Sequence, residues 1–242
     1  MQLERFSSDL AVIGRLLRGM SRSGSHQERL EQFYRPQAEH YDRFRERLLG
    51  GRQELIDAIT LPNQARVLEL GAGTGANLTR FSADRIAASH FVLVDLCPAL
   101  LAVARRRWQG HPNVTVVEAD AAQFDSEARF DLVVMSYALS MMPSYQAVIA
   151  NAHRLLRNGG ILAAVDFYTW TEPRSSIQAQ ASTERWFWST WFRHDGVTVD
   201  ASRLQALIQQ FPSHRLVTAR QPLPWLGPFR VPYFRFLGIK TR

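Results

Sequence analysis

The sequence contains one cysteine, Cys97, among 242 residues, so a disulfide within the chain is excluded. A lone thiol is typical of a reducing compartment and gives no basis for a structural zinc site. No apolar run approaches the roughly 18 residues of a membrane span, and the first ten residues carry two acids where a signal peptide is apolar. We therefore expect a cytoplasmic protein without a metal site.

Lysine is nearly absent, and arginine supplies all but one of the 29 basic residues. Residues 1–52 hold ten basic and seven acidic side chains, residues 53–170 hold nine and eleven, and residues 171–242 hold ten and four. The basic flanks could bind an anionic membrane surface or nucleic acid. No recognisable nucleic-acid-binding module accompanies them, so we expect peripheral contact with the inner face of a membrane and no nucleic-acid partner.

Short apolar runs typical of buried strands alternate with amphipathic segments typical of helices. The expected strands are 65–70, 91–96, 113–120, 129–139 and 161–168. The expected helices follow the first strand and cover 98–108 and 144–160, where an Asn-Gly-Gly turn ends the last one. This alternation predicts an α/β fold with a mostly parallel sheet and helices on both faces.

Ligands bind such sheets where the carboxyl ends of the strands meet. Polar and aromatic candidates follow the expected strands: Glu69, Asp95, Asp120, Ser136, Tyr137, Asp166 and Tyr168. The sequence therefore predicts a single site at this edge of the sheet.

The string ELGAGTGA, residues 69–76, fits two classes of ligand. Its glycines let the backbone approach a ligand closely, and Asp95 at the end of the next strand suits ribose hydroxyls. A dinucleotide and S-adenosyl-L-methionine both satisfy these features. The second is favoured because the Glu69 carboxylate suits a cationic amino-acid ligand, and Asp120-Ala121 suits an adenine amino group.

Residues 66–168, with the LLRNGG hairpin before the fifth expected strand, resemble the class I S-adenosylmethionine-dependent methyltransferases. The resemblance implies a Rossmann-like, mostly parallel seven-stranded sheet. It also implies a cofactor site that includes Glu69, Gly71, Ala72, Gly73, Gly75, Asp95, Leu96, Asp120, Ala121, Ser136 and Tyr137. We expect an N-terminal helical cap over 1–60, the methyltransferase domain over 61–242, and an aromatic-rich insertion on the substrate side at about 169–212.

Several strings resemble, more closely, the N-methyltransferase family of betaine-lipid synthesis, which converts diacylglyceryl-homoserine to its N,N,N-trimethyl form. They are YDRFRERLLGGR (41–52), VDLCPALLAVARRR (94–107), SYALSMMP (136–143), VDFY (165–168) and VPYFRFLGIK (231–240). The first 30 or so residues have no counterpart in that family, and the opening motif lacks its Thr-Arg and aromatic residues. A sibling enzyme with a different acceptor would show such departures.

The segment HYDRFRERLLGGR, residues 40–52, has two interpretations. It is either an amphipathic helix that only covers the domain, or a helix that closes over the cofactor. In the second case Tyr41 and Arg52 lie near the methionine end, where a guanidinium pairs well with a carboxylate.

Methyl transfer from a sulfonium is an in-line displacement, so the enzyme mainly positions and desolvates the acceptor. An amine attacks in its neutral form and needs no strong base, whereas a methylated ammonium is held by aromatic faces and a nearby carboxylate. The predicted catalytic residues are therefore Tyr137, Asp166 and Tyr168, with Phe167 beside them. Asp166 could instead stabilise local structure.

Aromatic residues crowd the segment TERWFWSTWFRHDGV, residues 183–197, and an apolar stripe runs through residues 6–20. Each is either core, a lid, or a surface that contacts lipid. Residues 221–236 predict a loop followed by an edge strand, because prolines restrict pairing.

These features predict an S-adenosylmethionine-dependent N-methyltransferase of lipid biosynthesis that acts on the amine of a homoserine-type headgroup or a related acceptor. One alternative enzyme uses the aminocarboxypropyl arm instead, by transfer or by cyclisation to azetidine-2-carboxylate, and releases methylthioadenosine. A non-catalytic cofactor sensor or RNA-associated protein is the alternative of another class.

Overall fold

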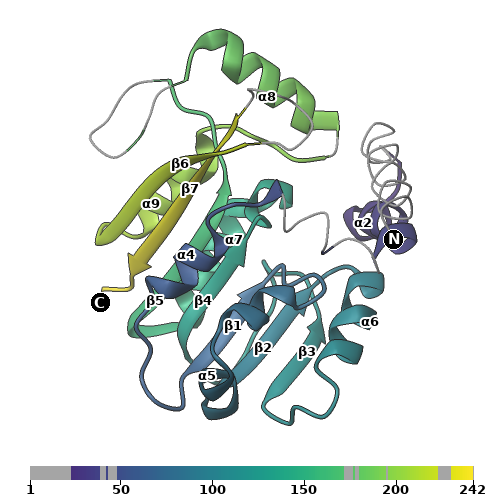
Figure 1. The fold of residues 1–242 in the computed structure, drawn as a ribbon, viewed down its shortest axis with the longest axis vertical. Coiled ribbons are helices and arrows are strands. Elements are labelled where there is room, and N and C mark those ends of the chain that lie inside the picture. The colour runs from purple at the N-terminus through teal and green to yellow at the C-terminus, as the bar shows by residue number, and fades with distance from the viewer. Residues whose placement is uncertain are drawn as a thin grey trace.

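The computed structural model describes residues 23–38, 42, 48–171, 177, 180–194, 196–222 and 230–241. Its centre is a seven-stranded sheet of order β3-β2-β1-β4-β5-β7-β6 (Figure 1). The strands are β1 (Arg66–Leu70), β2 (His90–Asp95), β3 (Val114–Glu118), β4 (Phe130–Ser136), β5 (Leu156–Phe167), β6 (His214–Pro222) and β7 (Arg230–Ile239). Strands β1 to β5 are parallel, and β7 runs antiparallel to both neighbours. The predicted α/β class and mostly parallel seven-stranded sheet are confirmed.

Helices cover both faces of the sheet, as predicted. They are α2 (His26–Tyr34), η1 (Arg35–Gln37), α4 (Arg52–Asp57), η2 (Ala76–Arg80), α5 (Ala83–Ala88), α6 (Pro98–Arg107), η3 (Leu139–Met141), α7 (Tyr145–Leu155), α8 (Ser182–His194) and α9 (Ser202–Gln210). Helices α7 and α9 pack on one face of the sheet, and α4 and α8 pack on the other. Alternate residues of β4 enter the two cores, Val133 on the first face and Leu132 and Val134 on the second. This is why the central strands are continuously apolar. No helix among the described residues is long and apolar enough to cross a bilayer.

The predicted end of α7 is wrong. The helix ends at Leu155, and Leu156 is already extended, with φ −68° and ψ 145°. Strand β5 then runs through the Asn-Gly-Gly sequence, with a register shift against β4 and a hydrogen bond from Gly159 N to Lys240 O of 2.9 Å. Gly159 has φ +75°, so its freedom is used for an irregularity within the strand and not for a turn that ends the helix.

The prediction of an edge strand near the carboxyl terminus is also wrong, because β7 lies between β5 and β6 and the edge is β6. Pro232 is compatible with this interior position. The pairing of β7 with β5 begins at Tyr233, so Pro232 pairs with β6 alone, opposite Arg220. Its missing N–H therefore removes no bond to β5.

The Gly-Gly pair that ends the segment 40–52 packs against the carboxyl-terminal hairpin. A Cβ on Gly50 would lie 2.5 Å from Gln221 Oε1, and a Cβ on Gly51 would lie 2.3 Å from Tyr233 Cε2. Gly51 also has φ +76°, where side chains other than hydrogen are strained. The two glycines thus let the start of α4 lie directly on β7.

We expect Gly51→Ala to lower the free energy of unfolding by about 3 kcal/mol, the sum of backbone strain and overpacking against Tyr233. Gly110→Ala is the matched control, because Gly110 has φ +86° but nothing within 4 Å of an added Cβ. Gly110→Ala should lower the free energy of unfolding by the backbone strain alone, about 1 kcal/mol. Urea denaturation of both variants measures the difference, and equal losses would contradict the packing argument.

Candidate active site

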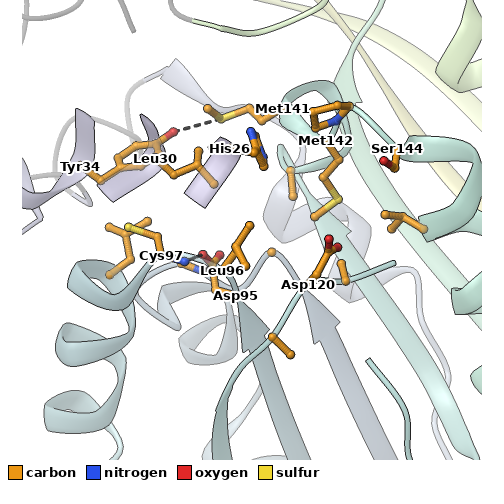
Figure 2. Close-up of a pocket in the computed structure, with 18 of the residues that line it drawn as sticks. His26, Leu30, Tyr34, Asp95, Leu96, Cys97, Asp120, Met141, Met142 and Ser144 are labelled. Carbon is orange, nitrogen blue, oxygen red and sulfur yellow. Dashed lines mark hydrogen bonds between the residues drawn. The ribbon is translucent and has the colours of Figure 1, made fainter. Parts of the chain in front are cut away.

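A cavity of about 290 Å³ lies at the carboxyl ends of β1 to β4. Its lining consists of His26, Leu30, Tyr34, Gly71, Gly73, Asp95, Leu96, Cys97, Leu100, Ala119, Asp120, Ala121, Tyr137, Ala138, Met141, Met142, Pro143, Ser144 and Val148. Figure 2 shows Leu30 and Tyr34 of α2 across the cavity from Asp95 and Leu96. Seven of the residues predicted to bind a cofactor are brought together here: Gly71, Gly73, Asp95, Leu96, Asp120, Ala121 and Tyr137.

Asp95 joins the glycine segment, residues 71–75, to the start of α6. Its Oδ2 accepts a hydrogen bond from Gly73 N, and its Oδ1 accepts one from Cys97 N, both at 2.8 Å. Backbone N–H donors on both oxygens hold the carboxylate in one orientation at the floor of the cavity. The last residue of β2 therefore shapes the cavity as well as lining it.

The glycine segment forms a cradle that side chains would fill. Gly71 has φ +76°, and a Cβ there would lie 2.4 Å from Ala138 Cβ. Gly75 has φ +67°, its O accepts a hydrogen bond from Trp108 Nε1 at 3.0 Å, and an added Cβ would meet the same indole. Only glycine fits at Gly71 and Gly75. The backbone of Gly71 and Gly73 lines the cavity.

Other predicted contacts lie behind this surface. The cavity lining formed by the described residues does not include Arg52, Glu69, Ala72, Gly75 or Ser136. Buried Glu69 accepts a hydrogen bond from Asn77 Nδ2 at 2.7 Å, and buried Arg52 donates from Nε to Leu49 O at 3.1 Å. Their roles toward a cofactor remain predictions.

The segment 40–52 reaches the glycine segment through Asp42. Its Oδ1 accepts from Thr74 Oγ1, its Oδ2 accepts from Arg107 Nη2, and Arg107 Nη1 donates to Thr74 O at 2.7 Å. Tyr41, predicted to contact the cofactor, lies outside the described residues. The contacts of Asp42 favour the interpretation in which this segment supports the site.

Tyr137 has the most unusual backbone in the lining. It follows β4 with φ +52°, a conformation that is rare for a non-glycine residue and frequent at functional sites. Its N donates to Val165 O at 2.7 Å, and its hydroxyl donates to Gly50 O at 2.8 Å. The ring lies 4.7 Å from that of Phe167, which packs behind Tyr137 in the core.

The other two predicted catalytic residues lie outside the described lining. Asp166 is buried and accepts hydrogen bonds from Ser140 N on Oδ2 and from Phe167 N on Oδ1, both at 2.8 Å. Burial raises the pKa of Asp166 to about 6, and the two backbone donors oppose that rise. Tyr168 is buried in the core beneath α9, and burial raises the pKa of its hydroxyl. For both residues, catalysis remains a prediction.

Helix α2 supplies three lining residues that the predicted site does not include, His26, Leu30 and Tyr34. A signal for the start of this helix was present, because Ser25 and Glu28 form a reciprocal capping box. Nothing in the spacing of these residues indicated which part of the sheet the helix would cover.

Helix α2 is fixed over the cavity by polar contacts on both sides. Glu31 Oε2 accepts hydrogen bonds from Ala99 N at 2.9 Å and from Cys97 Sγ at 3.4 Å. The Tyr34 hydroxyl donates to Met141 Sδ at 3.0 Å, which Figure 2 marks with a dashed line. These bonds connect α2 to the start of α6 and to the segment after β4, so the helix forms the roof of the cavity.

His26 is the basic side chain of this roof. Burial lowers the pKa of its imidazole, the nearby Arg29 guanidinium lowers it further, and the Asp120 carboxylate opposes both. A neutral imidazole can accept a proton, and it faces a cavity that also contains two carboxylates. Asp120 holds its own loop by accepting a hydrogen bond from Ala122 N at 2.8 Å.

Comparisons with known proteins agree with this geometry. Residues 67–160 match the family model described as a methyltransferase domain. The chain is 29% identical over 209 residues to the 2-phytyl-1,4-naphtoquinone methyltransferase of Thermosynechococcus vestitus, which covers 82% of this chain and 89% of that protein. It is 32% identical over 169 residues to the trans-aconitate 2-methyltransferase of Variovorax paradoxus, covering 69% of this chain and 61% of that protein. The chain thus spans less than two thirds of the second relative.

A solved structure shares the fold. The phosphoethanolamine N-methyltransferase 2 of Haemonchus contortus, in complex with phosphomonomethylethanolamine and S-adenosylhomocysteine, matches with a TM-score of 0.70 and 12% identity. The match covers 91% of this chain and 61% of that one. The sheet order, the glycine cradle, the matched domain and the methyltransferase relatives lead to one conclusion. The chain is a class I methyltransferase that depends on S-adenosyl-L-methionine.

Proposed function

We propose that this enzyme methylates the amine of an amino-acid-type lipid headgroup, with a homoserine headgroup as the leading acceptor. The observation that carries the proposal is the wall of the cavity formed by Tyr137 and the segment after it. The string SYALSMMP, residues 136–143, which resembles the betaine-lipid N-methyltransferases, supplies Tyr137, Met141, Met142 and Pro143 to this wall.

The residues of the cavity fit S-adenosyl-L-methionine. Asp95 would bind the ribose hydroxyls, and Asp120 with Ala121 would bind the adenine edge. The backbone of Gly71 and Gly73, which lines the cavity, would lie against the amino-acid end of the cofactor. When bound, the cofactor supplies a methyl group on a positively charged sulfur.

The roof of the cavity and the wall at Tyr137 fit an amine. An acceptor amine must be neutral to attack, and the neutral imidazole of His26 can take the proton that it releases. The ring of Tyr137, backed by that of Phe167 at 4.7 Å, suits a methylated ammonium, its face contributing about 0.5–2 kcal/mol according to its desolvation. Buried Asp166 would act by fixing Ser140 and so the segment that carries Tyr137.

A lipid acceptor is supported by two further features. The relative from Thermosynechococcus vestitus is named for a phytyl-substituted naphthoquinone, which is an apolar acceptor. Trp186 and Trp191 of α8 are exposed.

We expect the purified enzyme to convert diacylglyceryl-homoserine and S-adenosyl-L-methionine into methylated lipid and adenosylhomocysteine. Chromatography with mass spectrometry measures both products, and Asp95→Asn is the control that shows they come from this cavity. Release of methylthioadenosine in place of adenosylhomocysteine would identify aminocarboxypropyl chemistry. Salt-sensitive RNA binding without turnover would identify the non-catalytic alternative.

A further inference from the structure

Helix α8 has an outward stripe without any charge. Positions spaced by three and four along a helix share one face. The outer stripe consists of Thr183, Trp186, Phe187, Thr190 and Trp191. A solvent-facing helix stripe is normally polar or charged, so these aromatic residues are unexpected on this side.

The outer tryptophans lie outside the buried core. Trp188, on the inward side, is 1% exposed and packs in the core, whereas Trp186 is 71% exposed and Trp191 is 41% exposed. The Trp191 ring lies 5.9 Å, between centroids, from the ring of the partly buried Phe187 on the same helix. Large exposed apolar side chains that gather on one face mark a binding surface.

Positive charge borders this stripe. Glu184, the acidic residue of α8, is paired with Arg220 Nη1 at 2.5 Å, so its charge is compensated. Exposed Arg230 lines a groove of about 580 Å³ together with Trp186 and Phe187. Residues 171–242 carry ten basic and four acidic side chains, a net +6. The surface therefore combines aromatic rings with a positive border.

The stripe connects to the wall of the cavity through touching rings. Tyr137 lies 4.7 Å from Phe167, and Phe167 stacks on Phe192 of α8 at 4.5 Å. Phe192 lies 5.8 Å from Trp188, which in turn lies 4.9 Å from Phe187 of the outer stripe. Figure 1 shows α8 and α2 at the same end of the strands, the upper end in the view. A surface that contacts α8 would therefore face the same edge as the cavity.

We propose that the outer stripe of α8 docks on an anionic phospholipid bilayer, from which the enzyme takes its acceptor. The inference rests on the proposed lipid acceptor and names the surface that reaches it. Tryptophan rings suit the boundary between headgroups and acyl chains, and arginines suit anionic lipid. A second copy of the chain fits less well, because a symmetric contact through this face would bring the arginine borders together.

Cosedimentation with vesicles tests the docking directly. The full-length enzyme should bind vesicles of phosphatidylcholine with 30% phosphatidylglycerol at least tenfold more tightly than phosphatidylcholine alone. Trp186→Ser/Trp191→Ser should lose at least tenfold of the binding to anionic vesicles. Ile239→Ser is the matched control, because Ile239 is also a large exposed apolar residue, 43% exposed, but lies at the far end of β7. This control should bind like the unmodified enzyme.

Two outcomes would overturn the docking. One is equal vesicle binding by the double variant and the unmodified enzyme, or no binding by either. The other is a concentration-dependent dimer that the double variant abolishes. Methylation of deacylated glyceryl-homoserine separates this inference from the proposed function, since the soluble acceptor needs no membrane. If that acceptor is methylated equally by both proteins and vesicles are not bound, only the docking is wrong. If vesicles are bound but neither acceptor is methylated, the proposed function is wrong.

Discussion

Replacing Asp95 by asparagine should weaken the binding of S-adenosyl-L-methionine about 100-fold, equivalent to about 2.7 kcal/mol. The loss has two causes. The two carboxylate oxygens accept from Gly73 N and Cys97 N, so an amide nitrogen in place of either oxygen would face a backbone donor. The variant also removes the charge that we propose binds the ribose hydroxyls. Isothermal titration calorimetry measures the dissociation constant.

Asp131→Asn is the matched control for this experiment. Asp131 also accepts a backbone hydrogen bond within the sheet, from Arg66 N at 2.7 Å, and pairs with Arg157. It lies at the amino end of β1 and β4, the edge opposite the cavity. Its replacement should lower stability but leave the dissociation constant within about threefold of the unmodified enzyme. If Asp95→Asn also stays within that range, the assignment of Asp95 to the ribose is wrong.

The ends of β1, β2 and β3 were predictable from the sequence because each is marked by a change from apolar to acidic or glycine residues. Asp95 is the last residue of β2, as predicted, whereas Asp120 lies two residues beyond the end of the neighbouring β3 and not within it. A parallel sheet then brings them to one edge without further information. The sequence could not show what each carboxylate contacts. Glu69 lies at the predicted strand end and accepts a hydrogen bond from Asn77, eight residues further along the chain.

The roof and the far end of the sheet depend on packing between distant segments. The capping box at Ser25 predicts a helix start, but the docking of α2 rests on Glu31 meeting Ala99, 68 residues away. The position of β7 inside the sheet likewise depends on β6 pairing outside it. Prolines favour an edge strand, but Pro232 lies one residue beyond the pairing with β5 and so interrupts none of it. A local sequence pattern does not show which residues of a strand pair with each of its neighbours.

Asp166 shows how a residue at the predicted position can act on the site from behind. Three contacts hold the peptide that follows Tyr137: Asp166 accepts from Ser140 N, Thr198 N donates to Ser140 O at 2.8 Å, and Arg203 Nε donates to Leu139 O at 3.0 Å. We expect Asp166→Ala to lower kcat/KM about 100-fold, because Ser140 N and Phe167 N both lose their acceptor and the cavity wall loosens. Asp166→Asn keeps one acceptor and should lose less. Steady-state kinetics measures both values.

The same carboxylate predicts how stability changes with pH. Burial raises the pKa of Asp166 from an ordinary 3.8 to about 6 in the folded protein. The folded state therefore binds the proton more tightly than the unfolded state. This contribution to stability is complete below pH about 4 and is lost as pH rises through about 6, a change of about 3 kcal/mol. Asp166→Asn cannot ionise. The free energy of unfolding of the unmodified protein minus that of the variant should therefore fall by about this amount from pH 4 to pH 7, as measured by urea unfolding.

Asp125→Asn is a control whose stability difference from the unmodified protein should change with pH in the opposite direction. A hydrogen bond from Arg154 lowers the pKa of the exposed Asp125 carboxyl, so any stability it contributes is present at neutral pH and lost on acidification. The free energy of unfolding of the unmodified protein minus that of Asp125→Asn should therefore rise, not fall, as pH rises. A free-energy difference for Asp166→Asn that stays constant or rises from pH 4 to pH 7 would show that the folded protein does not hold Asp166 as a high-pKa carboxyl. The carboxylate would then be fully stabilised by Ser140, Phe167 and Arg203, and its burial would cost the enzyme little at neutral pH.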